Sequence, residues 1–163
     1  MDGKKSNSSF PASFQPKKIT FPLVQCHYRR DMESPDETRI LYKLSVGIIE
    51  NDKIFLSIGV MVRAGKEFDE TKGVFQNEAF FVVTEALAHF EVSGVIPQIK
   101  SVLEFPMIAS MAATVYPFLK EKVTSLLGSN HVAYYLPSFN ISAFIKSNVD
   151  KIPVLDERVQ SKN

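Results

Sequence analysis

The clearest pattern in the chain is the alternation of apolar and polar positions between residues 40 and 62. Two neighbouring runs, 40–48 and 54–62, carry an apolar side chain at every second position. A period of two is typical of a strand with one buried face. The residues between the runs, Glu50-Asn51-Asp52-Lys53, favour a turn. The pattern therefore predicts an antiparallel hairpin with one face in the core.

Two further strands are expected on either side of this hairpin. Residues 19–30 are β-branched and aromatic enough for a strand, and Pro22 indicates that it lies at an edge or is broken there. In residues 79–92 the run from Phe80 to Thr84 favours a strand, whereas the following EALAHF favours a helix. A long strand is chosen because the hairpin would otherwise lack a neighbour. The charged segments 30–38 and 65–73 are predicted to be loops.

A long helix is predicted from Pro106, whose missing N–H costs nothing at the first helical position. Pro117 lies inside it and predicts a kink or a break, and Gly128 is expected to cap the C-terminal end. Apolar residues recur at three- and four-residue spacing and form one continuous stripe: Ile108, Met111, Ala112, Val115, Leu119, Val123 and Leu126.

The N-terminal half of this helix is apolar nearly all round, because Ala109, Ala113 and Tyr116 lie on its other side. Such a segment should be buried on two sides, which one sheet cannot provide. The sequence therefore predicts oligomerisation through the helix. The residues assigned to the oligomer interface are Ile108, Met111, Ala112 and Val115.

Three segments differ in composition. Residues 1–16 are polar and are predicted to form a disordered arm, 17–149 form one domain, and 150–163 form a flexible tail. Within the domain, residues 131–137 are expected to be a short strand or an extended loop. Ser138 or Asn140 could then cap a short helix that begins at Ile141.

The overall composition excludes several classes of protein. Lys plus Arg number 19 and Asp plus Glu 18, so no summed charge favours nucleic acid or an anionic membrane. The single cysteine, Cys26, excludes an intramolecular disulfide and is compatible with a reducing compartment. No apolar run is long enough for a signal peptide or a membrane span, so a cytoplasmic location is expected.

Catalytic chemistry finds little support. The histidines, His27, His89 and His131, are scattered without metal-ligand spacing, and no glycine-rich phosphate motif or hydrolase elbow is present. Asp69 and Glu70 belong to a charged loop that is most simply solvated. We therefore expect no catalytic residues, no metal, no cofactor and no enzymatic activity.

Apolar recognition is the function that these exclusions leave. Residues 134–145 form a dense aromatic and aliphatic segment that exceeds what one short helix can hide. Each residue taken singly is most simply part of the core. Together they predict an accessible apolar groove.

The C-terminal third resembles the SecB protein-export chaperone family. The residues that carry the resemblance are Tyr116-Pro117-Phe118 inside the long helix, the run 123–127, and Leu136-Pro137-Ser138-Phe139-Asn140 followed by Phe144. The order of the upstream strands is similar too, so the resemblance spans residues 17–146. It implies an α+β fold: a four-stranded antiparallel sheet with a long helix and a short C-terminal helix on one face.

The resemblance also implies a function. SecB proteins are homotetramers, dimers of dimers, and act as ATP-independent holdases that bind unfolded or precursor polypeptides in apolar grooves during protein transport. The residues expected to line such a groove here are Met32, Tyr135, Leu136, Phe139, Ile141 and Phe144.

This chain departs from the family in its charge. The positions that carry acidic side chains in relatives that dock to SecA fall on Lys18, Pro22 and a site near Val83, which weighs against docking to SecA. The alternative hypothesis is a dedicated interaction protein on the same fold with a single client, such as a chaperone that holds an antitoxin in a toxin–antitoxin system.

Overall fold

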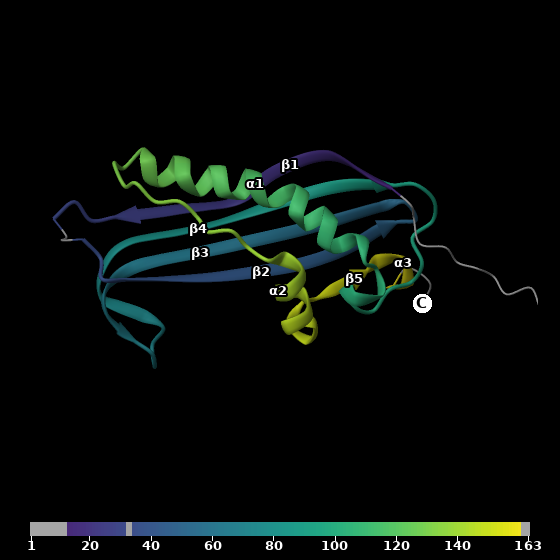
Figure 1. Cartoon of the computed structure of the whole chain (residues 1–163). Coiled ribbons are helices and arrows are strands. Elements are labelled where there is room, and N and C mark those ends of the chain that lie inside the picture. Colours follow the sequence, from purple (N-terminus) through teal and green to yellow (C-terminus); the bar gives the residue numbers. More distant parts are fainter. Residues whose placement is uncertain (1–12, 32–33, 161–163) are drawn as a thin grey trace, which may run out of the picture.

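The computed structural model describes residues 13–31 and 34–160 and consists of a five-stranded sheet with helices packed on it (Figure 1). The strands, in chain order, are β1 (Phe14–Tyr28), β2 (Glu37–Glu50), β3 (Lys53–Asp69), β4 (Val74–Val92) and β5 (Val154–Asp156). They lie side by side in the order β1-β4-β3-β2-β5, and only β5 runs parallel to its neighbour. The α+β class is as predicted, but the sheet is mixed and five-stranded, not antiparallel and four-stranded.

The predicted hairpin is confirmed as β2 and β3. The two strands are antiparallel and pair from Glu37↔Gly65 to Glu50↔Lys53. The alternation of the sequence appears directly in the burial. Leu44, Val46 and Ile48 on β2, and every second residue of β3 from Ile54 to Ala64, are at most 5% exposed.

The ambiguous segment 79–92 is a strand, as predicted, and β4 begins earlier, at Val74. The charged segment 65–73 is mostly strand too, because β3 continues to Asp69 and pairs there with Val74. Two aromatic rings, Phe68 and Phe75, contact each other edge-on across this hairpin with centroids 4.9 Å apart. This cross-strand contact extends the pairing into a segment whose charges predicted a loop.

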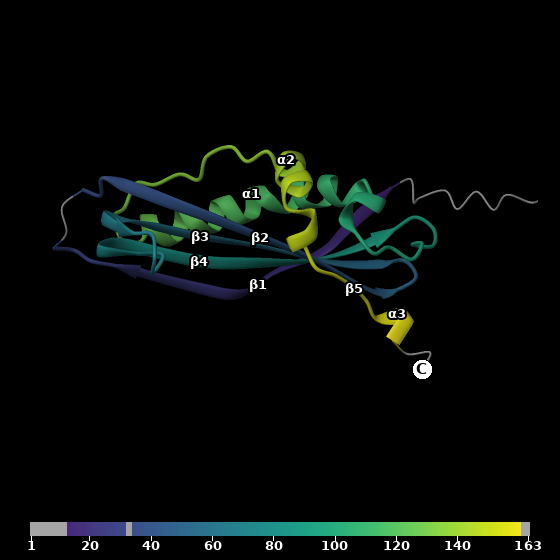
Figure 2. The same cartoon turned by 90° about the horizontal axis from the view of Figure 1, so that it is seen from below.

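The helices α1 (Met107–Gly128) and α2 (Ile141–Ser147) lie on the same face of the sheet (Figure 2). α1 packs over β4 and β3. Most residues of the predicted stripe are fully buried there, although near the C-terminal end Leu127 is buried and Leu126 is only half-buried. The helix continues unbroken through Pro117, so the predicted break is absent. The carbonyl that loses its partner belongs to Ala113, which is exposed and can therefore bond to water.

Both predicted ends of the domain need correction. Phe14 and Pro16, assigned to the disordered arm, belong to β1, where the ring of Phe14 packs edge-on against Phe90 at 5.5 Å. The remainder of the predicted arm, residues 1–12, lies outside the described residues. The tail predicted to be flexible contains η2 (Val149–Lys151), β5 and α3 (Glu157–Gln160). A strand of three residues is too short to give a periodic signal, which is why the sequence does not predict it.

Candidate functional site

Four aromatic rings, from β2, α1, α2 and the connection between the two helices, form a cluster on the helical face of the sheet, beside β2. Tyr42 of β2 stacks on Phe139 with the ring centroids 3.9 Å apart and the planes at 18°. Phe144 of α2 lies 5.2 Å from Phe139, and Tyr116 of α1 lies 5.4 Å from it. Tyr42, Phe139 and Phe144 are only half-buried. The cluster therefore presents part of its aromatic surface to solvent.

The two tyrosines of this cluster are joined by their hydroxyl groups. The Tyr116 hydroxyl donates to the carbonyl oxygen of Pro137 at 2.9 Å, so the Tyr42 hydroxyl donates to the Tyr116 oxygen at 3.2 Å. Burial raises the pKa of both tyrosines above the usual value, and the bond to Tyr116 adds to the shift at Tyr42. Both side chains are consequently neutral donors at physiological pH. They anchor the connection between α1 and α2 over the sheet.

The edge of β2 next to the cluster carries backbone groups without a strand partner. Among the described residues, β5 pairs with β2 only at Val46, Gly47 and Ile48, so the part of β2 from Glu37 to Ser45 is an open edge. The N–H of Val46 donates to Pro153 on this side. Backbone groups of successive residues point to opposite edges of a strand, so those of Leu44 and Tyr42 point to the same side as Val46. An extended polypeptide could pair with them.

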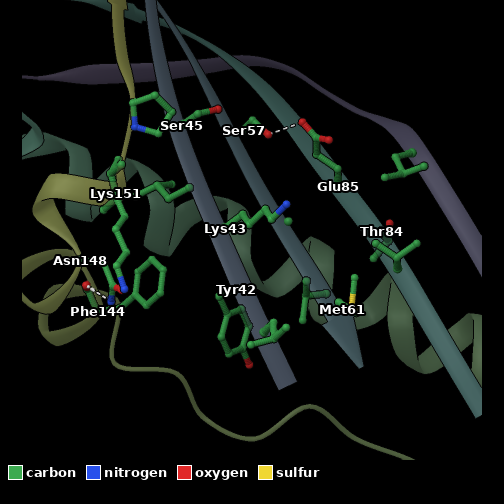
Figure 3. A pocket seen from close by; sticks show the side chains of 18 residues that line it. Tyr42, Lys43, Ser45, Ser57, Met61, Thr84, Glu85, Phe144, Asn148 and Lys151 are labelled. Atoms are coloured by element: carbon green, nitrogen blue, oxygen red, sulfur yellow. Dashed lines mark hydrogen bonds between the residues drawn. The ribbon is translucent and has the colours of Figure 1, made fainter. Parts of the chain in front are cut away.

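A hollow of about 490 Å³ adjoins this edge (Figure 3). On one side it is lined by α2 and the segment that follows, where Phe144, Asn148 and Lys151 lie beside β2. It continues over the face of the sheet opposite α1. This part is lined by side chains from four strands: Leu23, Leu41, Lys43, Ser45, Ser57, Met61, Val83 and Glu85.

Gly59, which has no side chain, lies in the floor of the hollow over the open face. The position that a Cβ atom would take at Gly59 lies 3.8 Å from the Cβ of Lys43 and 3.8 Å from the carbonyl oxygen of Thr84. Around it, Ser57 donates a hydrogen bond to the Glu85 carboxylate. The floor is thus polar at its centre, whereas the neighbouring row Leu41, Met61 and Val83 is apolar.

The structure brings together only part of the groove that the sequence predicts. Phe139 and Phe144 belong to the cluster, and Phe144 lines the hollow. Leu136 and Ile141 are 1% and 7% exposed and belong to the core, so their predicted place on an accessible surface is wrong. Tyr135 is 72% exposed but makes no part of the hollow's lining. The remaining predicted residue, Met32, lies outside the described residues.

The predicted oligomer interface also needs correction. The side chains of Ile108, Met111, Ala112 and Val115 are 0% exposed, because they pack on the chain's own sheet. No surface of theirs is left for a second copy. The other apolar side of α1 is partly covered as well, since Tyr116 is buried beneath the connection to α2. Phe118, by contrast, is 47% exposed.

Sequence reasoning missed the parts of the site that belong to β2 and to the C-terminal segment. The alternation places Tyr42 on the buried face of its strand. The side chain does lie on that face, but its ring is only half-buried. Asn148 and Lys151 lie in a stretch without periodicity. The sequence offers one signal for Tyr42, which is that a tyrosine stands among the aliphatic residues of this strand. A buried tyrosine hydroxyl requires a hydrogen-bond partner, so such a side chain tends to lie at the border of a core.

Within residues 13–31 and 34–160 no three His, Cys, Asp or Glu side chains gather in a way that could hold a metal ion. The described helices include none that is long and apolar enough to cross a membrane.

The sequence matches no protein-family model and no curated protein. The fold is similar to that of a solved SecB-like chaperone of Mycobacterium tuberculosis, Rv1957, in complex with a ChAD peptide from the HigA1 antitoxin Rv1956. The TM-score is 0.57 with 14% sequence identity, over 78% of this chain and 91% of that chain. At this identity the likeness establishes a SecB-like fold, which is the fold that the resemblance of the C-terminal third implies.

Proposed function

We propose that the chain is an ATP-independent holdase that binds extended segments of unfolded or unassembled polypeptides along the open edge of β2. The observation that carries the proposal is the position of this edge, from Glu37 to Ser45, directly beside the half-buried aromatic cluster and the hollow. The similarity of the fold to that of a chaperone supports it. The binding residues proposed are Tyr42, Phe139 and Phe144, with Tyr135 and Met32 retained from the sequence as further client contacts.

Two kinds of contact would contribute to client binding. Backbone groups of β2 would pair with the main chain of the client, which every sequence possesses, so this contact is indifferent to the client's side chains. Apolar side chains of the client would alternate between the aromatic cluster on one face and the row Leu41, Met61 and Val83 on the other. Such binding favours segments with alternating apolar residues and needs no chemical step, in keeping with a holdase that uses no nucleotide.

We further propose that the chain forms a homotetramer, a dimer of dimers, but through other residues than the sequence indicated. β1 is the opposite edge of the sheet, and Leu23 and Val24 on it are 42% and 41% exposed. The outer side of α1 offers Ala113 and Phe118. These two exposed surfaces, one a strand edge and one a helix side, support two different contacts between copies.

A second candidate function is supported by the solved neighbour, which is in complex with an antitoxin peptide. On this hypothesis the same groove serves one dedicated client, such as an antitoxin, and has no general holdase activity. Affinity purification of the tagged chain from its native host separates the two: one stoichiometric partner favours the dedicated role, and many substoichiometric partners favour the holdase.

The proposed function is tested by the aggregation of a chemically unfolded protein diluted into buffer with and without the purified chain. We expect suppression near a stoichiometric ratio without ATP, and a loss of most of it in Phe144→Ala. Leu103→Ala is the matched control, since Leu103 is 53% exposed and does not line the hollow. If the wild-type chain leaves aggregation unchanged, the holdase proposal is wrong, and equal losses in both variants would exclude the groove as its site.

A further inference from the structure

The short strand β5 occupies the same edge of β2 that the proposed function assigns to clients. Val154, Leu155 and Asp156 pair in parallel with Val46, Gly47 and Ile48, in line with the open part of the edge. Ile152 and Pro153, immediately before β5, line the hollow. The C-terminal segment therefore begins at the wall of the proposed groove and continues along its edge.

β5 itself is held weakly by its own side chains. It has only three residues, Leu155 is 47% exposed and Val154 is half-buried. The residue before it, Pro153, accepts a hydrogen bond from the Val46 N–H at 3.1 Å but has no N–H to donate in return. A parallel pair this short contributes few ladder hydrogen bonds and little buried apolar area.

Arg158, which follows β5 in α3, ties this strand to the connection after β4. Its guanidinium holds the Asp156 carboxylate through two bonds, of 2.6 and 2.8 Å, and the two side chains are only 17% and 8% exposed. It also donates to the carbonyl oxygens of Ile96 at 2.7 Å and Pro97 at 3.2 Å. These carbonyls belong to the connection after β4. Arg158 thus links the strand to a remote part of the chain.

We propose that β5 is a resident strand which a long bound polypeptide displaces, so that the C-terminal segment restricts access to the part of the β2 edge that follows Ser45. This inference rests on the proposed function. An outward N–H such as that of Val46 can pair with one strand at a time, so β5 and a client strand exclude each other there. If β5 must detach first, the apparent dissociation constant is the intrinsic one divided by the fraction of molecules in which it is detached.

The length of the client distinguishes a β5 that can be displaced from a β5 that stays in place. The open part of the edge, Glu37 to Ser45, is nine residues long, roughly 30 Å at 3.3 Å per residue, and so accommodates a strand of about eight residues. A strand of about 14 residues needs the whole of β2. Short clients therefore bind without moving β5, and long ones compete with it.

The test pins β5 reversibly with a disulfide between Gly47→Cys and Leu155→Cys, in a Cys26→Ser background. Gly47 and Leu155 are partners in the parallel ladder, and a Cβ at Gly47 would lie 3.8 Å from the Phe55 Cβ, an ordinary contact. Fluorescein-labelled peptides of alternating Val and Thr, about eight and about 14 residues long, are titrated by anisotropy. Oxidised and reduced protein are the same polypeptide, so each serves as the folding control of the other.

We expect oxidation to weaken binding of the long peptide about tenfold, to leave the short one unchanged, and to be reversed by reductant. Arg158→Ala is an independent variant that should strengthen binding of the long peptide about threefold, because it raises the detached fraction. Arg29→Ala removes an exposed arginine near the other end of the sheet and should change neither peptide.

The outcomes separate the two proposals. If neither peptide binds to the wild-type chain, the proposed function is wrong. If both bind, and neither oxidation nor Arg158→Ala changes the affinity for the long peptide, then clients do not displace β5 and the resident-strand inference is wrong while the proposed function stands.

Discussion

The hydroxyl relay from Tyr42 through Tyr116 to Pro137 should contribute to stability in an asymmetric way. Tyr42 only donates, to Tyr116 at 3.2 Å, whereas Tyr116 both accepts this bond and donates to the Pro137 carbonyl at 2.9 Å. Replacing each tyrosine by phenylalanine, singly and together, removes the hydroxyls and keeps the rings. The three variants form a double-mutant cycle around one defined contact.

The expected change in the free energy of unfolding depends on how many hydrogen bonds each variant loses and how many polar groups it leaves without a partner. Tyr42→Phe removes one bond and should lower the free energy of unfolding by about 1 kcal/mol. Tyr116→Phe removes both bonds and deprives the Pro137 carbonyl and the Tyr42 hydroxyl of their partner, so its cost should be about 2 to 3 kcal/mol. The double variant loses the same two bonds but has no stranded hydroxyl. It should therefore cost no more than Tyr116→Phe alone, which gives a coupling of about 1 kcal/mol.

Urea unfolding followed by circular dichroism measures these differences, with an unchanged m-value as the sign that the folded and unfolded states have kept their exposed surface. Additive single effects, within about 0.3 kcal/mol, would refute the relay, because independent hydroxyls do not couple. The same reasoning applies to binding. Since Tyr116 fastens the connection that carries Phe139, Tyr116→Phe should weaken binding of an unfolded protein more than Tyr42→Phe does.

Three further predictions concern stability and assembly. Burial raises the folded-state pKa of Tyr42 and Tyr116 above the unfolded value near 10. The stability that the neutral hydroxyls contribute is therefore complete below about pH 10 and is lost as the pH rises from there. The urea midpoint, measured between pH 8 and 11, should fall at the upper end of this range, and it should fall less in Tyr42→Phe than in the wild type. Thr84 is 0% exposed, and its hydroxyl has no hydrogen-bond partner in the described part of the chain. Thr84→Val should therefore raise the free energy of unfolding by about 1 kcal/mol, and a decrease would contradict this. Thr84→Ser, which keeps the hydroxyl and loses a methyl group, should lower the free energy of unfolding. Phe118→Asp should reduce the proposed tetramer to a smaller species in light scattering, and an unchanged mass would remove the outer side of α1 from the assembly.

The strands could be predicted from the sequence because their burial is one-sided. In β2 and β3 every second residue faces the helices, so the alternation is present in the residue types themselves. β4 was ambiguous because Glu85, Ala86 and Leu87 have helical propensity. Pairing with β3 on one side and β1 on the other overrides that propensity, which is why the argument from missing neighbours succeeded where local propensity did not.

The site could be predicted only in part, because its groups have no periodic signal. Phe139 and Phe144 stood out as aromatic residues in a segment with polar interruptions, and the structure places both in the cluster. The open edge of β2 is a property of the sheet's order, which depends on where the last strand is added. The sequence of β5, Val154–Asp156, has no pattern that distinguishes it from the polar segment around it. Neither β5 nor the edge of β2 that it leaves open could therefore be predicted.

The error about α1 has a physical origin that bears on the assembly. Periodicity correctly identified a helix with too much apolar surface for one sheet, and the inference was that a second copy covers the excess. Part of that excess is instead covered by the chain itself, since the connection before α2 returns over α1 and receives the Tyr116 hydroxyl at Pro137. Less apolar surface is thus left for another copy on this side, and Phe118 is its exposed large residue. A stable tetramer would consequently need a second contact, and the edge of β1, which has no neighbour among the described residues, is the surface that the fold offers for it.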